Sequence, residues 1–352
     1  MPFPIDEKLV IAIASSALFD LTESDRVYKK QGVDVYRKHQ RENENVVLAP
    51  GVAFPLIRRF LSLNDGLSEP QRPVEVVLLS RNDPDTGLRV FNSIEHYGLD
   101  ISRASFVNGG NPFRYMRAFN ASLFLSANVA DVKEAVTRGL PAGRVFPTDF
   151  ADSAHDPGLR MAFDFDGILA DDASEIVFKT AGLRAFQTNE QRLAGQPHRH
   201  GPLARFFREI ARLQKFELRR QREDRSYVPR LRTAIATARN APAHKRVVTT
   251  LRDWGISVDE VFFLGGIEKR RILEEFRPHI FFDDQLQHIE GVAGVAPSVH
   301  VPFGIANAPS PTLIRQAFAE NRRRSKQASR LARKKASRQE RNSRRRPRRG
   351  KK

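Results

Sequence analysis

The stretch Met161-Ala162-Phe163-Asp164-Phe165-Asp166-Gly167-Ile168-Leu169 decides the fold, because an apolar segment ends there in the pattern Asp-x-Asp-Gly. Such a segment predicts a buried strand, and in an extended chain the side chains of residues i and i+2 point the same way. The carboxylates of Asp164 and Asp166 should therefore converge, and their repulsion is tolerable only with a cation or a shared proton. Mg²⁺ is the natural oxygen-seeking partner, and Gly167 allows a sharp turn. The alternative is an ordinary Asp-rich turn after a strand.

Similar apolar runs recur along the chain, and helix-like segments lie between most of them. In residues 247–254, for example, the apolar side chains fall on one face of a helix. Continuous apolar strands alternating with amphipathic helices predict an α/β fold with a doubly wound parallel sheet covered on both faces. In such a sheet, polar residues just past the carboxyl ends of strands line the ligand crevice. The expected strands are residues 9–14, 74–79, 123–125, 161–163, 234–236, 261–264 and 279–282.

Polar residues follow two more of these strands and a glycine pair. One strand ends in Asp283 and Asp284, which can complete a metal site with the first carboxylate pair, although an exposed Asp-Asp turn is common. Another ends in Thr237, whose hydroxyl either donates a hydrogen bond to a phosphate oxygen or packs at the strand end. Lys269 follows Gly265-Gly266 and opens an apparent helix, where it either neutralises phosphate charge or lies on the surface like most lysines.

The two halves of the chain resemble each other when one is shifted along the other. A shift of 150 positions places residues 11–32 over residues 161–182, and shifts of 156 and 157 align residues 106–124 with residues 262–281. We interpret this similarity as an ancient duplication; the alternative is two doubly wound domains that share strand and turn chemistry. The charged residues at the strand ends of the second half are not kept at the aligned positions of the first half, so we expect the chemistry in the second half and a degenerate partner in the first. The aligned pairs are Ala14 with Asp164, Ser16 with Asp166, Phe113 with Lys269, Ser126 with Asp283 and Ala127 with Asp284.

In combination, these residues resemble the haloacid dehalogenase-like (HAD) phosphatase superfamily, whose four motifs occur in this order. The resemblance is closer still to the cytosolic 5'-nucleotidase type I family, and it covers roughly residues 9–312. The block from Pro278 to Gln285 is highly specific, whereas the superfamily motifs alone are moderately so. The segments that carry the resemblance are residues 163–167, 174–175, 236–239, 277–285, 109–112, 123–127 and 300–304.

The resemblance implies a role for each residue at the strand ends. Asp164 would attack phosphorus and form an aspartyl-phosphate intermediate. Asp166 would protonate the leaving oxygen and later deprotonate the attacking water. Thr237 and Lys269 would hold the phosphoryl oxygens and neutralise their charge. The Mg²⁺ ligands that the resemblance implies are Asp164, the backbone carbonyl of Asp166, Asp283 and, either as a ligand or as an orienting partner, Asp284.

The expected organisation has two Rossmann-like HAD-type domains and a tail: a degenerate domain in residues 1–150, a catalytic domain in residues 151–312 and a basic tail in residues 313–352. The segment at about residues 183–230 is longer than a usual strand–helix connection, and the resemblance implies a helical cap over the active site there. The apolar stripe of residues 203–218 is better explained by core packing than by stacking on a base. The histidines without a convincing ligand partner are expected on the surface or in loops: His198, His200 and His244.

The charge of the chain is concentrated at its C-terminal end. The 352 residues carry a formal net charge of +18, of which residues 322–352, with 17 basic residues and one acid, contribute +16. A basic nucleic-acid-binding fold throughout is therefore excluded. The tail is either a solvated charge run or a nonspecific contact for RNA or DNA, and it contains no aromatic residue to stack on bases. Beyond a short amphipathic helix at residues 312–318, its composition cannot build a core, and we expect it to be disordered.

Cysteine content and hydropathy limit the remaining classes. The chain has no cysteine, which excludes disulfides, thiolate nucleophiles and zinc–thiolate sites. No apolar run is long enough for a transmembrane helix. Residues 9–18 follow Asp6-Glu7-Lys8 rather than a basic leader, so we interpret them as a buried strand and not as a signal peptide. We therefore expect a cytoplasmic protein without membrane contact, and the sequence is compatible with an oligomer.

These observations favour a Mg²⁺-dependent 5'-nucleotidase that hydrolyses nucleoside 5'-monophosphates, AMP first, to nucleoside and phosphate. Two alternatives stay open. Because no residue that would read a base is evident, the substrate of a HAD phosphatase could instead be another small phosphoester. The third hypothesis is a nucleic-acid-associated protein tethered by residues 322–352.

Overall fold

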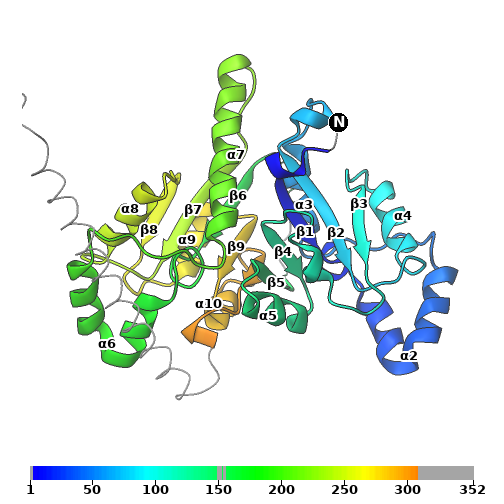
Figure 1. Cartoon of the computed structure of the whole chain (residues 1–352), viewed down its shortest axis with the longest axis horizontal. Coiled ribbons are helices and arrows are strands. Elements are labelled where there is room, and N and C mark those ends of the chain that lie inside the picture. The colour runs from blue at the N-terminus through cyan, green and yellow to red at the C-terminus, as the bar shows by residue number, and fades with distance from the viewer. Residues whose placement is uncertain (1–2, 149–152, 154–155, 308–352) are drawn as a thin grey trace, which may run out of the picture.

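The centre of the molecule is a single sheet that runs through both halves of the chain. The computed structural model describes residues 3–148, residue 153 and residues 156–307. Its ten strands have the order β3-β2-β1-β4-β5-β10-β9-β6-β7-β8 (Figure 1), and every neighbouring pair is parallel except β5 with β10. The strands are β1 (Leu9–Ile13), β2 (Val74–Ser80), β3 (Arg103–Phe106), β4 (Leu123–Ser126), β5 (Ala142–Phe146), β6 (Leu159–Phe163), β7 (Leu231–Thr237), β8 (Glu260–Phe263), β9 (Ile280–Asp283) and β10 (Ser298–His300).

Helices cover both faces of this sheet, because successive side chains of a buried strand point to opposite sides. On one face, Phe163 of β6 packs against Phe206 and Phe207 of α7. On the other face, the preceding Ala162 belongs to a core cluster with Leu273 of α9. The helices are α1 (Ser15–Leu18), α2 (Thr22–Glu42), α3 (Phe54–Ser62), α4 (Leu88–His96), α5 (Val129–Thr137), α6 (Ala173–Arg192), α7 (Ala204–Glu223), α8 (His244–Asp253), α9 (Lys269–Phe276) and α10 (Leu286–Gly291).

The strand order of the first half is repeated in the second half. The sequence β3-β2-β1-β4-β5 corresponds strand by strand to β8-β7-β6-β9-β10, as a duplication would produce. The halves meet where Val145 of β5 pairs with Val299 of β10 in antiparallel register. Gly143 lies at this junction, and a Cβ atom on it would collide with Val299. The α/β class and the predominantly parallel sheet are therefore confirmed, whereas the division into separate domains at residues 1–150 and 151–312 stays a prediction.

The helix that follows the first strand of each half is folded back on itself. α2 and α6 each break at a glycine, Gly32 and Gly182, whose φ angles are 82° and 78°. Backbone with positive φ and extended ψ is essentially restricted to glycine. In α6 the two arms touch, because the Ser174 hydroxyl donates a 2.8 Å hydrogen bond to Glu190 Oε1. α6 is thus a helical hairpin that begins directly after the loop of residues 164–172.

The segment expected to form a cap, at about residues 183–230, is divided between two environments. Its first part is the second arm of α6 and the loop up to residue 203. Its second part is α7, which places Phe206, Phe207 and Ile210 in the core. Core packing of the apolar stripe is therefore confirmed. Within this segment, the α6 arm and its loop remain the candidates for a cap, and the cap itself stays a prediction.

The strands expected from apolar runs are all present. The structure adds β3, β5 and β10, which are short and interrupted by polar residues or glycine. The helix expected at residues 312–318 and the tail of residues 313–352 lie outside the described residues. Among those that are described, no helix is long and apolar enough to cross a membrane.

Candidate active site

The chemically distinctive side chains gather at the carboxyl edge of three adjacent strands, β9, β6 and β7. Asp283 ends β9, Asp164 follows β6 directly, and Thr237 ends β7. Lys269 begins α9, the helix after β8, and its side chain returns to the same place. All four residues are buried. The four positions to which the resemblance assigned roles therefore lie at one edge of the sheet, because parallel strands bring their carboxyl ends together.

Lys269 joins the two buried carboxylates. Its Nζ lies 3.1 Å from Asp164 Oδ1 and 2.6 Å from Asp283 Oδ2. Burial opposes the charged form of Lys269, but the two carboxylates outweigh it and raise the pKa of the ammonium group. Burial likewise opposes ionisation of Asp283, yet Lys269 and His288 hold its pKa below the usual value. The lysine and Asp283 therefore form a charged pair inside the protein.

Asp164 is the second carboxylate that contacts Lys269, and its charge is compensated less than that of Asp283. Its Oδ1 accepts a 2.7 Å hydrogen bond from the Phe165 backbone N–H. Burial is the main cause that raises the pKa of Asp164 to about 7; Asp283 and Asp166 add to this shift, and Lys269 opposes it. A cation beside this group would favour the ionised form. The site thus presents a carboxylate that titrates near neutrality and would be activated by an added positive charge.

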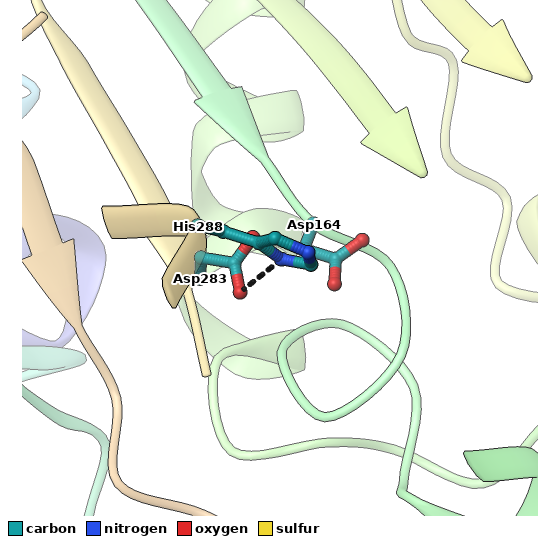
Figure 2. Close-up of side chains that lie close together, drawn as sticks. All are labelled: Asp164, Asp283 and His288. Atoms are coloured by element: carbon teal, nitrogen blue, oxygen red, sulfur yellow. Dashed lines mark hydrogen bonds and ion pairs between the residues drawn. The ribbon is translucent and has the colours of Figure 1, made fainter. Parts of the chain in front are cut away.

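His288 belongs to this cluster, although the sequence analysis did not single it out. It lies on α10, one turn after the Asp283-Asp284 pair, and its Nδ1 is 3.0 Å from Asp283 Oδ2. Figure 2 shows its ring beside Asp283, with Asp164 opposite. One ligand atom from each of Asp164, Asp283 and His288 lies within 4.8 Å of the others. A histidine in the helix after an Asp-Asp pair was the signal that could have identified it.

Asp284 lies next to Gly167 of the loop that carries Asp164 and Asp166. It is completely buried, and within the described part of the chain neither carboxylate oxygen has a hydrogen-bond partner. A Cβ atom on Gly167 would lie 2.5 Å from Asp284 Oδ2, so glycine permits this close approach. Burial and the charges of Asp283 and Glu175 raise the pKa of Asp284 well above its usual value. A buried carboxylate without partners, beside two other carboxylates, is a donor set that suits Mg²⁺.

The Asp166 side chain is held by an arginine. Arg239 Nε and Nη2 donate to its two carboxylate oxygens, each at 2.7 Å. β6 ends at Phe163, so the chain is no longer a strand at Asp166, and the side-chain alternation of a strand does not fix its direction. Asp166 still lies close enough to raise the pKa of Asp164. The Oγ1 of Thr237 accepts a 3.3 Å hydrogen bond from the Arg239 N–H, which links the β7 end to this pair.

His198 lies in the loop after α6, which is one of the two expected positions, but it does not lie on the surface. His198 is buried, and its ring packs edge-on against Phe165 with centroids 5.4 Å apart. The loop after α6 is held under α8, since the His198 N–H donates a 3.0 Å hydrogen bond to Thr250 Oγ1. His200 is exposed and His244 is partly buried at the start of α8. His198 contacts Glu190, another buried residue that the sequence analysis did not single out, at 3.4 Å.

Fold and site together define an α/β protein with a buried carboxylate–lysine cluster at the carboxyl edge of a parallel sheet. The chain belongs to the 5'-nucleotidase family, whose sequence model matches residues 1–308. Its sequence is 36% identical over 297 residues to human cytosolic 5'-nucleotidase 1B, an alignment that covers 82% of this chain and 48% of the relative. The chain therefore matches about half the length of that relative. No solved structure matches the sequence closely enough to count as a relative. The resemblance found in the motifs is confirmed.

Proposed function

We propose that this protein is a Mg²⁺-dependent 5'-nucleotidase that converts nucleoside 5'-monophosphates, AMP first, to nucleoside and phosphate. Family membership and the name of the human relative support the reaction class. The observation that carries the proposal is the contact of Lys269 with both Asp164 and Asp283 inside the protein. A buried lysine between two carboxylates is suited to accept the charge of a phosphoryl group that enters beside it.

Mg²⁺ fits the donors at this edge of the sheet. Asp164, Asp283 and the backbone carbonyl of Asp166 would hold it, and the unpartnered carboxylate of Asp284 supplies further negative charge next to them. When bound, the ion would neutralise phosphoryl oxygens and favour the ionised form of the nucleophile. His288 already contacts Asp283 and would fix the orientation of that carboxylate.

Asp164 would act as the nucleophile, and Asp166 as the acid and base. A carboxylate oxygen of Asp164 forms a bond to phosphorus while the bond from phosphorus to the nucleoside 5'-oxygen breaks; that oxygen leaves with the electron pair and takes a proton from Asp166. Water then attacks phosphorus and gives its proton to Asp166. The bond between phosphorus and Asp164 breaks, which releases phosphate and restores the carboxylate.

Thr237 and Lys269 would hold the phosphoryl oxygens during both steps. Lys269 contacts Asp164, and Thr237 ends β7, the strand beside β6, so both residues would lie at the edge of the sheet that a phosphoryl group on Asp164 occupies. The α6 hairpin would cover the site as the cap, because it begins immediately after the nucleophile loop. A location in the cytoplasm is proposed from the relative's name.

Phosphate release from a panel of nucleoside 5'-monophosphates, with Mg²⁺ and with EDTA, tests the proposal. We expect turnover with Mg²⁺, none with EDTA, and a loss on the order of 10³-fold or more in Asp164→Asn. Full activity of Asp164→Asn would exclude the mechanism. Equal rates for all bases, with sugar phosphates preferred, would instead assign the protein to phosphatases of other small phosphoesters.

The proposal that residues 322–352 contact RNA or DNA is tested separately. We expect salt-sensitive binding to either nucleic acid in the full chain and none after deletion of these residues, with nucleotidase activity retained. If the full chain binds neither RNA nor DNA at low salt, this partner is excluded.

A further inference from the structure

Beyond the strand-end cluster, three charged side chains lead from the surface of the site into the interior. Asp166 is held by two nitrogens of Arg239, and the third nitrogen of Arg239 contacts Glu190 on the second arm of α6. Glu190 also pairs with Arg246 at 2.9 Å. The side chain of Asp166 is 18% exposed, whereas those of Arg239 and Glu190 are 2% and 0% exposed. Of these three acidic and basic groups, Asp166 is the one that a bound molecule can reach.

The first half contains the same scaffold without this set of charges. Arg246 has a counterpart in Arg89, and the Nε atom of each donates a 2.9 Å hydrogen bond to a backbone carbonyl of the loop after the hairpin. Each also contacts the residue at the Glu190 position, which in the first half is Gln40. With the shifts of 150 and 157 positions, the counterparts of Asp166, Glu190 and Arg239 are Ser16, Gln40 and Asn82.

The first half shows that packing at these positions does not require charged side chains. Gln40 is buried like Glu190, so a neutral side chain satisfies the same packing. A buried ion pair is weak evidence for stability, because the cost of desolvation offsets the attraction. The carboxylate of Glu190 and the guanidinium of Arg239 therefore accompany the carboxylate of Asp166, and the scaffold does not require them.

We propose that Glu190 and Arg239 are positioning residues that fix the Asp166 carboxylate for its proton transfers, an inference that rests on the function proposed above for Asp166. Two donors on one rigid guanidinium set both the place and the plane of a carboxylate. A carboxylate has about four lone-pair sites, so two remain on Asp166: one can carry the proton that it gives to the leaving oxygen, and in the ionised form they can accept a hydrogen bond from water. Glu190 holds Arg239 from the opposite side and is itself held by Arg246 and Ser174.

The test replaces each residue by its counterpart in the first half, as Glu190→Gln, Arg239→Asn and the double variant. We expect folded proteins whose kcat falls on the order of 10- to 100-fold, with KM changed less than about threefold, since both side chains are buried behind Asp166. Because Glu190 acts through Arg239, the double variant should lose no more activity than Arg239→Asn alone. Should Arg239→Asn fail to fold, Arg239→Lys keeps the charge, removes the two-bond contact and should lower kcat similarly. Gln40→Ala is the matched control and should leave kcat unchanged.

Crystal structures of the wild type and of Glu190→Gln test the positioning independently of turnover. In the variant, Asp166 should lose its two-bond contact or take more than one orientation. The inference is overturned if the contact persists unchanged, if kcat stays within about twofold of the wild type, or if the losses of the two single variants multiply in the double variant. A wild type that hydrolyses no phosphoester, while the contact responds as expected, would overturn the proposed function and the proton transfers, and would still show that Glu190 and Arg239 fix the place of the Asp166 carboxylate.

Discussion

The two halves of the sheet share their turns and differ in their charges. In each half, the side chain that ends the fourth strand accepts a hydrogen bond from the backbone N–H two residues later. Ser126 accepts from Asn128 at 3.1 Å, and Asp283 accepts from Gln285 at 2.8 Å. A hydroxyl and a carboxylate thus stabilise the same turn. The shape of the strand end therefore does not depend on the charge that the second half places there.

The charges differ as a set. The position of Lys269 is taken in the first half by Phe113, whose side chain is fully buried. Asp164 and Asp283, the two partners of this lysine, correspond to Ala14 and Ser126. A buried cation is tolerable when buried anions face it, and the reverse also holds. One half retains the whole electrostatic cluster and the other has none of it, which is what the mutual dependence of buried charges requires.

Removal of Lys269 alone should leave the buried carboxylates without their cation, and it should have the largest effect on stability and activity. In Lys269→Met, two buried carboxylates lose their common partner, so we expect the free energy of unfolding to fall by about 3–5 kcal/mol and turnover to be lost. Urea denaturation without Mg²⁺ measures the first, and phosphate release the second. The matched change in the first half, Phe113→Met, should cost about 1 kcal/mol. Equal costs in the two halves would contradict the view that the second is organised around charge.

The sequence predicted the parts of this fold that depend on local patterns. The strands around Phe163 and Phe282 were predicted because they are buried on both faces and read as continuous apolar runs. The pairing of β5 with β10 was missed, since Ser298–His300 is three residues long and its partner contains glycine and arginine. No local sequence pattern indicates that the two half-sheets join through β5 and β10.

The candidate site divides in the same way. Asp164 and Asp283 were predicted to meet because each stands at or just after the carboxyl end of a parallel strand, whereas Lys269 was placed beside them by the family resemblance alone. Glu190 and His288 were missed because their places depend on how the second arm of α6 and the helix α10 return to the strand ends. Such contacts are set by tertiary packing rather than by residue spacing.

His198 makes the stability of the second half depend on pH, whereas its counterpart in the first half, Leu48, is also buried but does not titrate. Burial lowers the pKa of His198 to about 4, against the opposing effect of Glu190. The folded protein therefore binds fewer protons than the unfolded chain between pH 4 and 6.5, and it loses stability as the pH falls through this window. His198→Leu should remove this loss, which is at most about 3 kcal/mol. Urea denaturation between pH 5 and 7 measures it; an unchanged slope would contradict the assignment.

Replacement of Asp284 tests whether the unpaired carboxylate of the second half contributes to the binding of a cation. Asp284→Ala introduces the residue of the first half, Ala127. Without Mg²⁺ we expect the variant to be at least as stable as the wild type at pH 7, because a buried carboxylate without partners is removed. Its affinity for Mg²⁺ should fall by about 10- to 100-fold. Titration calorimetry measures the affinity, and thermal melting with Mg²⁺ and with EDTA measures the linked stabilisation. An unchanged affinity for Mg²⁺ would show that Asp284 is not part of the metal site.

The smallest effect concerns the two hairpin tips, where the halves are alike in backbone. Gly32 and Gly182 have positive φ, and no atom outside their neighbours lies within 4 Å of a Cβ built on either. Alanine should therefore cost the same at both, about 1–2 kcal/mol, through backbone strain alone. If the α6 hairpin covers the active site, Gly182→Ala should also change KM, whereas Gly32→Ala should not. Denaturation curves and initial rates separate the two effects: equal costs with a change in KM at Gly182 alone would support the cap, and identical kinetics for both variants would exclude a cap sensitive to the shape of this tip.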